Sequence, residues 1–580
     1  MTRRTFLIAA LVVLAFAGLL RTVWLTSDPP ITNTVGVVWH DEGPWTHNAR
    51  NKALWGVWRT DNWNPMYLAP VFTGLEYAAF SAFGVGTWQA RTVPVVSGLA
   101  AVAFLIAGLA AVADRRTALM GGALLATNYA FVMWNRAALM ESTMTSLIVI
   151  SWAAYAMAQR RAWWGVIAGV AAVLAFFTKA SAAFFIAAIS AEALLAFVAA
   201  NLRTSPRDYA QGAPRESRGA EPQNLRTTLA AKCTLVGLAV ASVSIGFFFV
   251  LPNLSEFTFY NWQMSVARKP DYTLKAFKDR ASWLPLVHDF FTWMWPVLVA
   301  ASIAIIDIAT RARRARPAER LLVLWVLVGL LELVVHDSGN ERRYVMFFPA
   351  LIGLAAIWLN RRDADVTGRA AGRWWSVPLV CAMGYLVAGS TLRVLFLDEV
   401  RAGDLHTTVV WSAALAGLSA VGVFLLWRRI AGWLSHPHIP LAAAVAIALL
   451  TAGFDLNRFA VWARARQTLN YEASVEIGRL LPPGTLVQGK LANGLALENR
   501  IRPIFIGHDF GNYADRLQRD DARYILTYVS PSVGFESQRE SGMIQELLDH
   551  YARHRITATF VVDETSGPDR AALIDKFPGQ

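Results

Sequence analysis

Apolar stretches long enough to cross a membrane recur along most of this chain. Of its 580 residues, 55% are hydrophobic and only 16% are charged, which excludes an ordinary soluble protein and a disordered one. A helix that crosses about 30 Å of hydrocarbon needs roughly 20 mostly apolar residues. Counting on that basis predicts about thirteen membrane-spanning helices. They lie at 5–25, 89–112, 118–134, 139–158, 162–178, 180–200, 232–251, 286–308, 321–336, 344–360, 375–395, 407–427 and 439–456.

The connectors between these stretches alternate in charge. Every second one is rich in Arg and Lys, and by the positive-inside rule these connectors are cytoplasmic. The alternation places the N-terminus in the cytoplasm and the C-terminus outside. It depends on the two shortest stretches, 162–178 and 321–336, because losing one alone would break it. The formal net charge of +13 falls mostly in these connectors, so it indicates topology rather than a nucleic-acid partner. The connectors rich in basic residues are at 3–4, 115–116, 160–161, 201–231, 311–320, 361–362 and 428–429.

The first apolar stretch has a second interpretation, a cleaved secretory signal peptide. It is longer than a typical signal core, and Leu19-Leu20-Arg21-Thr22 is not a small-residue cleavage site. We therefore expect an uncleaved first span. The two cysteines, Cys233 and Cys381, lie in apolar stretches, so we expect neither a disulfide framework nor a thiolate metal site.

Composition divides the chain into two domains. Residues 1–456 form the predicted membrane domain, with a long first outside loop at 28–88. Within that loop, 66–83 is apolar but contains Pro70, Gly74 and Glu76, so we expect it to lie along the interface or re-enter rather than cross. A second outside loop, 252–285, carries basic residues such as Arg268 and Lys269, which suggests a use for positive charge on that side.

The tail, 457–580, has the composition of a soluble domain. Short strands are expected at 486–489, 501–506, 524–528 and 556–562, with helices at 472–481 and 540–553. The fold class is therefore a polytopic all-α membrane protein with a small C-terminal extracytoplasmic α/β domain.

The predicted topology brings polar residues from distant parts of the sequence to the outer membrane face. Each group has an ordinary interpretation: adjacent acids can form a solvated loop, Arg136 can form a structural ion pair with Glu141, and Lys179 can extend to the interface. Arg342-Arg343-Tyr344 can anchor the chain there. Together, cationic side chains beside an acid pair favour binding of an anionic lipid phosphate and activation of a neutral nucleophile. The candidates are Asp41, Glu42, Asn135, Arg136, Glu141, Lys179, Arg342, Arg343 and Tyr344.

A metal site is a weaker hypothesis. His40 and His47 flank the acid pair Asp41-Glu42 and could bind a divalent cation with it, but adjacent acids without a defined ligand spacing are weak evidence. We predict no metal site and no required cofactor, and leave a divalent metal open. The chain has no GxGxxG or P-loop between a strand and a helix, so no nucleotide site is predicted.

Several short motifs, in order and on one predicted side, resemble the GT-C membrane glycosyltransferases, specifically the protein O-mannosyltransferase and lipid A aminoarabinose transferase group. The resemblance covers roughly 35–360. The motifs are Asp41-Glu42, Asn64-Pro65-Met66-Tyr67, Phe83-Gly84, Arg91, Asn135 to Glu141, Thr178-Lys179, and Arg343-Tyr344 with Pro349. Two positions depart from the pattern: the group more often has Asp where Glu141 stands, and a Lys-Pro-Pro segment where this chain has Asn64-Pro65 and Ala69-Pro70.

The resemblance implies transfer of a sugar, with inversion, from a polyprenyl-phosphate-linked donor to a lipid, glycan or protein acceptor. The site would face the extracytoplasmic side of a bacterial inner (plasma) membrane. Asp41 would act as the base, with Glu42 and Glu141 positioning acceptor or sugar. Donor phosphate binding would fall to Lys179, Arg342, Arg343 and Tyr344, and the remaining pocket residues would be Arg91, Asn135, Arg136 and Tyr67.

Two other classes remain as alternatives. A transporter or flippase of an anionic polyprenyl-phosphate lipid could use the same basic residues without making a bond, although no inverted repeat is visible. A structural membrane protein would not require Asp41, Glu141 and Arg343 to meet.

Overall fold

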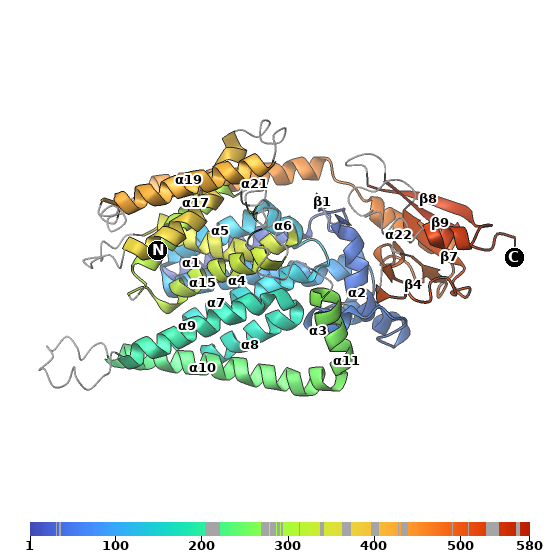
Figure 1. The fold of residues 1–580 in the computed structure, drawn as a ribbon, viewed down its shortest axis with the longest axis horizontal. Coiled ribbons are helices and arrows are strands. Elements are labelled where there is room, and N and C mark those ends of the chain that lie inside the picture. The colour runs from blue at the N-terminus through green and yellow to red at the C-terminus, as the bar shows by residue number, and fades with distance from the viewer. Residues whose placement is uncertain are drawn as a thin grey trace, which may run out of the picture.

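The computed structural model shows an elongated bundle of helices with a sheet domain at one end (Figure 1). It describes residues 1–30, 32–33, 36–202, 221–267, 294–312, 314–336, 341–361, 373–395, 405–426, 429–430, 439–489, 491–507, 510–528, 545–563 and 569–579, with single residues at 278, 283, 286 and 291. Arg268, Lys269 and most of the second half of the second predicted outside loop lie outside these ranges.

Each predicted span coincides with helical structure. The expected span at 118–134 is divided into two helices at Asn128, whose side chain accepts a hydrogen bond from the Phe131 N–H (3.0 Å) and caps the second one. The bundle consists of α1 (Arg3–Thr22), α4 (Thr87–Val112), α5 (Arg115–Thr127), α6 (Tyr129–Trp134), α7 (Met140–Ala158), α8 (Trp164–Thr178), α9 (Ala183–Leu202), α10 (Glu221–Ile245), α14 (Trp295–Thr310), α15 (Pro317–His336), α16 (Phe348–Leu359), α17 (Arg373–Leu395), α19 (Leu405–Leu425) and α21 (Leu441–Arg464).

Burial separates the central helices from the outer ones. Every residue of α16 is buried, and most of α7 is buried as well. The outer helices instead expose large apolar side chains such as Leu11, Phe248 and Leu418, as expected where lipid replaces water. Within the ranges that the structure describes, eight helices are long and apolar enough to cross a membrane, so the count of thirteen stays a prediction.

Two helices fill the segment predicted as the first outside loop. They are α2 (Val38–Trp55) and α3 (Pro70–Phe83), linked through the short 3-10 helix η1 (Pro65–Tyr67). In Figure 1 they lie between the bundle and the sheet domain. The helix α3 has 14 residues, fewer than the roughly 20 that cross a membrane, and the expectation that 66–83 does not cross stays a prediction. No helix was predicted at α2, and Pro44 lies inside it, where proline normally disfavours a helix.

Beyond α10 the backbone changes helical type. It continues as a π-helix, η5 (Gly246–Val250), then η6 (Leu251–Asn253), α11 (Leu254–Thr258) and a second π-helix, η7 (Phe259–Ala267). Figure 1 shows the chain turning at the end of α10 into α11. Two other 3-10 helices matter for the site, namely η2 (Ala180–Ala182) after α8 and η10 (Glu341–Phe347) before α16.

The C-terminal domain is built on a five-stranded mixed sheet of order β4-β3-β7-β9-β8. β3 (Leu486–Gln488) pairs in parallel with β4 (Arg502–Ile504) and β7 (Tyr524–Tyr528), whereas β9 (Asp569–Asp575) is antiparallel to both β7 and β8 (Arg555–Asp563). A helix, α22 (Leu469–Leu480), packs on the sheet, and α23 (Leu491–Gly494) follows β3. The remaining strands are short hairpin pairs: β1 (Thr32–Asn33) with β2 (Gly36–Val37), and β5 (Ile506–Gly507) with β6 (Phe510–Gly511).

The predicted α/β character of the tail is therefore observed, with two differences. The helix α21 continues to Arg464, so the sheet domain starts later than the predicted boundary at 457. The strand β9 was not predicted; its sequence, Asp-Arg-Ala-Ala-Leu-Ile-Asp, has no strict alternation of apolar and polar residues. Of the helix predicted at 540–553, residues 545–550 are helical.

Candidate functional site

Asp41 lies in the first turn of α2 and faces the helix η10. The Arg342 Nη1–H donates a hydrogen bond to Asp41 Oδ2 over 2.7 Å. The two side chains remain 16% and 25% exposed for Arg342 and Asp41, so solvent or a ligand can reach this ion pair. These residues are 301 positions apart in the chain, and the predicted topology had placed them on one membrane face.

A second acid and a second cation complete this charged cluster. Glu141, in the first turn of α7, forms an ion pair with Lys179, which follows α8 directly. Arg342 Nε is 4.0 Å from Glu141 Oε1. Arg342 therefore lies between the two acids, and Asp41, Glu141, Lys179 and Arg342 together carry no net charge.

Glu141 has hydrogen-bonding capacity left. Its Oε2 is buried and has no hydrogen-bond partner within the described part of the chain, and the same is true of the Thr145 hydroxyl one helical turn later. The Glu141 side chain is only 1% exposed. A buried carboxylate oxygen without a donor is costly, so a ligand hydroxyl at this position would gain a strong hydrogen bond.

Glu42 is engaged differently from its neighbour. Arg91 donates from Nε and Nη2 to the two carboxylate oxygens of Glu42 (2.8 and 2.7 Å), and the Ala138 N–H donates to Oε1 (2.7 Å). The remaining Arg91 nitrogen, Nη1, donates to the carbonyls of Leu25 and Ser27. Glu42 and Arg91 are thus a buried pair that joins α2 to α4, to the end of α1 and to the segment before α7.

Asn135 and Arg136 also hold the backbone in place. Asn135 accepts from Arg21 Nε (2.9 Å) and donates to the Ser142 hydroxyl (2.9 Å). Arg136 donates to the carbonyls of Leu20 and Trp24. It therefore does not form the ion pair with Glu141 that the sequence analysis considered.

Tyr67 and Tyr344 are both buried in packed surroundings. Tyr67 lies 6.1 Å from Tyr260, ring to ring, and Tyr344 lies 5.1 Å from Phe291. Tyr344 is fully buried and Tyr67 is 4% exposed. Arg343, between Arg342 and Tyr344, is partly buried.

The hypothesis of a metal site finds little support in the geometry. His47 points toward the C-terminal domain, with Nε2 2.9 Å from Asp61 Oδ1 and Nδ1 2.9 Å from the Asn493 side-chain nitrogen. Across the ranges with described side chains, no three His, Cys, Asp or Glu residues are grouped so that they could hold a metal ion. The side chain of His40 lies outside the described part.

Two residues near the site were missed from the sequence. Arg50 on α2 is 1% exposed and donates to the carbonyls of Ala496, Asn499 and Ile501, which attaches the C-terminal domain to α2. Asp28, after α1, accepts from the Asn470 N–H (3.3 Å). Burial raises the pKa of Asp28 to about 7, although the positive charge of Arg91 opposes this. No sequence signal pointed to either, because their partners lie more than 400 residues away.

Comparison with known proteins identifies the fold of the chain. Residues 69–211 match the family model described as dolichyl-phosphate-mannose-protein mannosyltransferase. The crystal structure of ArnT from Cupriavidus metallidurans in the apo state superimposes with a TM-score of 0.50 at 18% identity, covering 99% of this chain and 97% of that one. The chain has a GT-C glycosyltransferase fold. The predicted fold class is thereby confirmed.

Other solved structures extend the comparison. ArnT from the same organism bound to undecaprenyl phosphate matches equally, with a TM-score of 0.50, 18% identity and coverage of 99% and 98%. Archaeal oligosaccharyltransferase AglB from Archaeoglobus fulgidus is more distant, with a TM-score of 0.44, 13% identity and coverage of 90% and 69%. A search of curated protein sequences finds no match.

Proposed function

We propose that this GT-C protein transfers a sugar from a polyprenyl-phosphate carrier to a hydroxyl group of an acceptor, with Asp41 as the general base. The observation that carries the proposal is the ion pair of Asp41 with Arg342, flanked by Glu141 and Lys179. The match of 69–211 to a dolichyl-phosphate-mannose-dependent family, and the likeness to a protein solved with undecaprenyl phosphate, support the same substrate class.

The charges suit the reaction. The acceptor oxygen attacks the anomeric carbon, the bond from that carbon to the phosphate oxygen breaks, and the carrier phosphate leaves with the electron pair. Negative charge therefore grows on the phosphate, where Arg342, Arg343 and Lys179 can stabilise it. The acceptor proton passes to Asp41. Attack from the face opposite the leaving phosphate inverts the anomeric carbon.

Arg342 connects phosphate binding with proton transfer to Asp41. Its guanidinium contacts Asp41 directly, so a donor phosphate that binds Arg342 competes with Asp41 for the same N–H groups. Binding of the donor would release the carboxylate and make it a better proton acceptor. Glu141, with its unpartnered oxygen, would accept a hydrogen bond from a sugar hydroxyl, while Glu42 would position α2 through Arg91 rather than contact substrate.

The membrane arrangement belongs to the same proposal. Asp41 lies on α2, which in Figure 1 runs between the bundle and the C-terminal domain, and the alternation of basic connectors supports an extracytoplasmic position for that end of the bundle. The proposal includes a bacterial inner membrane, with a cytoplasmic N-terminus and an extracytoplasmic C-terminus. No comparison favours the transporter alternative.

The test is sugar transfer by purified protein in liposomes supplied with a panel of polyprenyl-phosphate sugars. We expect wild type to release free carrier phosphate, and Asp41→Asn to release it about 10²–10⁴ times more slowly, the usual contribution of a general base. The control is Asp114→Asn, because Asp114 caps α5 through backbone N–H groups (2.7 and 2.9 Å) and Asn caps helices equally well. Equal rates for Asp41→Asn and wild type would remove Asp41 from catalysis. Passage of labelled lipid across the bilayer with no release would favour the transporter.

A further inference from the structure

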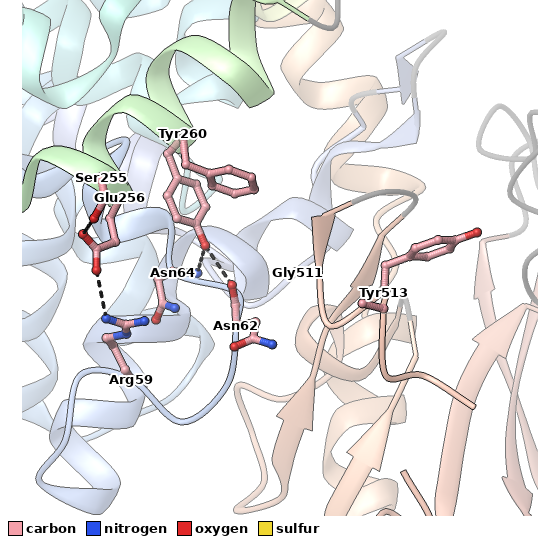
Figure 2. A pocket seen from close by; sticks show the side chains of 10 residues that line it. Arg59, Asn62, Asn64, Ser255, Glu256, Tyr260, Gly511 and Tyr513 are labelled. Carbon is pink, nitrogen blue, oxygen red and sulfur yellow. Dashed lines mark hydrogen bonds and ion pairs between the residues drawn. The ribbon is translucent and has the colours of Figure 1, made fainter. Parts of the chain in front are cut away.

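A cavity of about 600 Å³ lies between the helical body and the C-terminal domain, and no part of the charged cluster lines it. Its walls come from three segments that are distant in the sequence: 59–64 between α2 and η1, 255–260 in α11 and η7, and 511–514 at the end of β6. Figure 2 shows Arg59, Asn62 and Asn64 facing Glu256 and Tyr260 across this space, whereas the Tyr513 side chain points away from it. Its volume is typical of a small-molecule site.

The cavity is lined by one positively and one negatively charged side chain, which form an ion pair. Arg59 Nη1 lies 3.4 Å from Glu256 Oε1, and the two side chains are 50% and 33% exposed. They are the only charged residues among the ten that line the cavity. An anionic group would find its cation already paired, and a metal ion would find a single carboxylate. The cavity therefore favours a neutral ligand.

The polar wall is rigid and offers both donors and acceptors. The Tyr260 hydroxyl accepts from the Asn64 N–H (2.6 Å) and donates to the Asn62 carbonyl (2.9 Å), so it fixes the backbone on both sides of Trp63. The side-chain amide of Asn62 is exposed and makes no hydrogen bond in the described part of the chain. An amide that donates and accepts, a guanidinium that donates and a carboxylate that accepts match neighbouring sugar hydroxyls, each of which does both.

Trp63 connects this wall to the charged cluster. Its Nε1–H donates to the Pro44 carbonyl over 3.1 Å, and Pro44 follows Asp41 by three residues on α2. The Trp63 ring also lies 4.8 Å from Phe505 and 6.1 Å from Tyr260. The cavity and the proposed base thus share one packed wall made of α2 and the segment after it.

We propose that this cavity binds a neutral sugar unit of the acceptor, so that the acceptor is a glycan or a glycolipid. The inference rests on the proposed function, since an acceptor is needed only if the protein is a transferase. Known modes of peptide recognition use a sheet edge, an apolar groove or a cluster of like charge, whereas the side chains of this cavity offer mixed donors and acceptors with no net charge.

The experiment is saturation-transfer NMR on full-length protein in detergent, with neutral methyl hexosides and pentosides as probes. Glucuronic acid and a Ser/Thr tripeptide serve as the anionic and peptidic probes. We expect neutral glycosides to bind wild type, and Asn62→Ala, Arg59→Gln and Glu256→Gln to weaken that binding at least tenfold. The control is Glu476→Gln, which breaks a more exposed ion pair with Arg479 on α22 (3.0 Å) and should bind like wild type. Thermal melting verifies that each variant is folded.

Carrier release is measured separately, without added glycoside and with water in place of the acceptor, so that the two proposals fail independently: water attacks the anomeric carbon, the carrier phosphate leaves with the electron pair, and the proton passes to Asp41. Neutral glycosides that bind equally to wild type and to all three folded cavity variants would overturn the inference, as would binding of the tripeptide or glucuronic acid alone. If wild type releases carrier phosphate but binds no glycoside, the inference fails and the transferase stands. If glycosides bind as expected but no donor is cleaved, the cavity stands as a sugar site and the proposed transfer fails.

Discussion

Two buried glutamates close to the first helix of the site have opposite surroundings. Both oxygens of Glu42 are held by Arg91, whereas neither oxygen of Glu76 on α3 has a partner in the described structure. Burial raises the pKa of Glu76 well above its ordinary value, and the charge of Glu42 adds to this. Burial therefore favours the neutral form of Glu76, whereas the Glu42 carboxylate forms an ion pair with Arg91.

We predict that Glu42→Gln and Glu76→Gln differ sharply in stability. Glu42→Gln leaves the buried Arg91 charge without its counterion, and breaking such a pair costs about 3–5 kcal/mol. Glu76→Gln replaces one neutral group by another, and we expect a change within about 1 kcal/mol. Thermal melting of both variants in the same detergent checks this. Equal melting temperatures for the two would contradict the structural role assigned to Glu42.

Asp28 makes the stability of the protein depend on pH. Its pKa is about 7 in the folded protein against an ordinary value of 3.8, so between these values the folded state binds more protons than the unfolded state. Stability contributed by this group is present at low pH and is lost as the pH rises through 7. Asp28→Asn keeps an acceptor for the Asn470 N–H and removes the ionisation. We expect the variant to melt at a higher temperature than wild type at pH 8, and we expect this difference to shrink toward pH 5. A difference in melting temperature that stays constant with pH would show that Asp28 does not cause the pH dependence.

At the residue scale, much of the charged cluster was predictable. Topology placed Asp41, Glu141, Lys179 and Arg342 on one face, and the structure brings them into contact; their catalytic roles stay predictions. The sequence analysis made Asp41 the base and Glu42 a positioning residue, but it could not assign the contacts of the two carboxylates. Adjacent residues on a helix point about 100° apart, and only the packing of α2 determines which carboxylate meets Arg342 and which meets Arg91.

At the scale of elements, α2 is the helix on which the site depends, and a glycine allows its position. A Cβ added at Gly43 would lie 1.7 Å from the Asn493 carbonyl oxygen of α23. Only glycine lets the two backbones approach so closely. The same Gly43-Pro44 pair that allows this contact also disfavours a helix by local propensity, because Pro inside a helix normally breaks it. Local propensity and tertiary packing disagree here, and packing prevails.

We predict that Gly43→Ala separates α2 from the C-terminal domain. The added methyl group overlaps backbone atoms that cannot rotate away, and such overpacking costs about 1–3 kcal/mol or more. Gly74→Ala on α3 is the matched control, because a Cβ there meets nothing within 4 Å and alanine favours a helix by about 0.5–1 kcal/mol. Protease sensitivity near Arg464 and carrier release are the measurements. A Gly43→Ala protein as resistant and as active as Gly74→Ala would contradict the close contact.

At the scale of the whole molecule, the two domains are joined through α2. The three carbonyls that accept from Arg50 are 446–451 residues away in sequence. Composition could predict that a tail domain exists, and its strands followed from alternation. No local pattern could predict its attachment to the helix that carries Asp41, because that contact forms only when both domains are folded.

The number of membrane spans predicts on which side of the membrane the C-terminal domain lies. An odd number of spans, about thirteen, puts the termini on opposite sides of the membrane, whereas losing one weak span would put them on the same side. Replacing Cys233 and Cys381 by serine leaves no native thiol. A single cysteine is then introduced as Arg479→Cys, at a side chain that is 73% exposed, or as Arg161→Cys in an exposed connector between α7 and α8.

A membrane-impermeant maleimide added to intact cells should label Arg479→Cys at once and Arg161→Cys only after the membrane is opened. The physical reason is that the connector at 160–161 is basic and is held in the cytoplasm by the positive-inside bias, while an odd number of crossings carries the tail to the other side. Labelling of both positions only after opening would mean an even number of crossings. It would also place Asp41, which is fixed to the tail through Arg50 and Gly43, on the cytoplasmic side, and the proposal of an extracytoplasmic reaction would have to be abandoned.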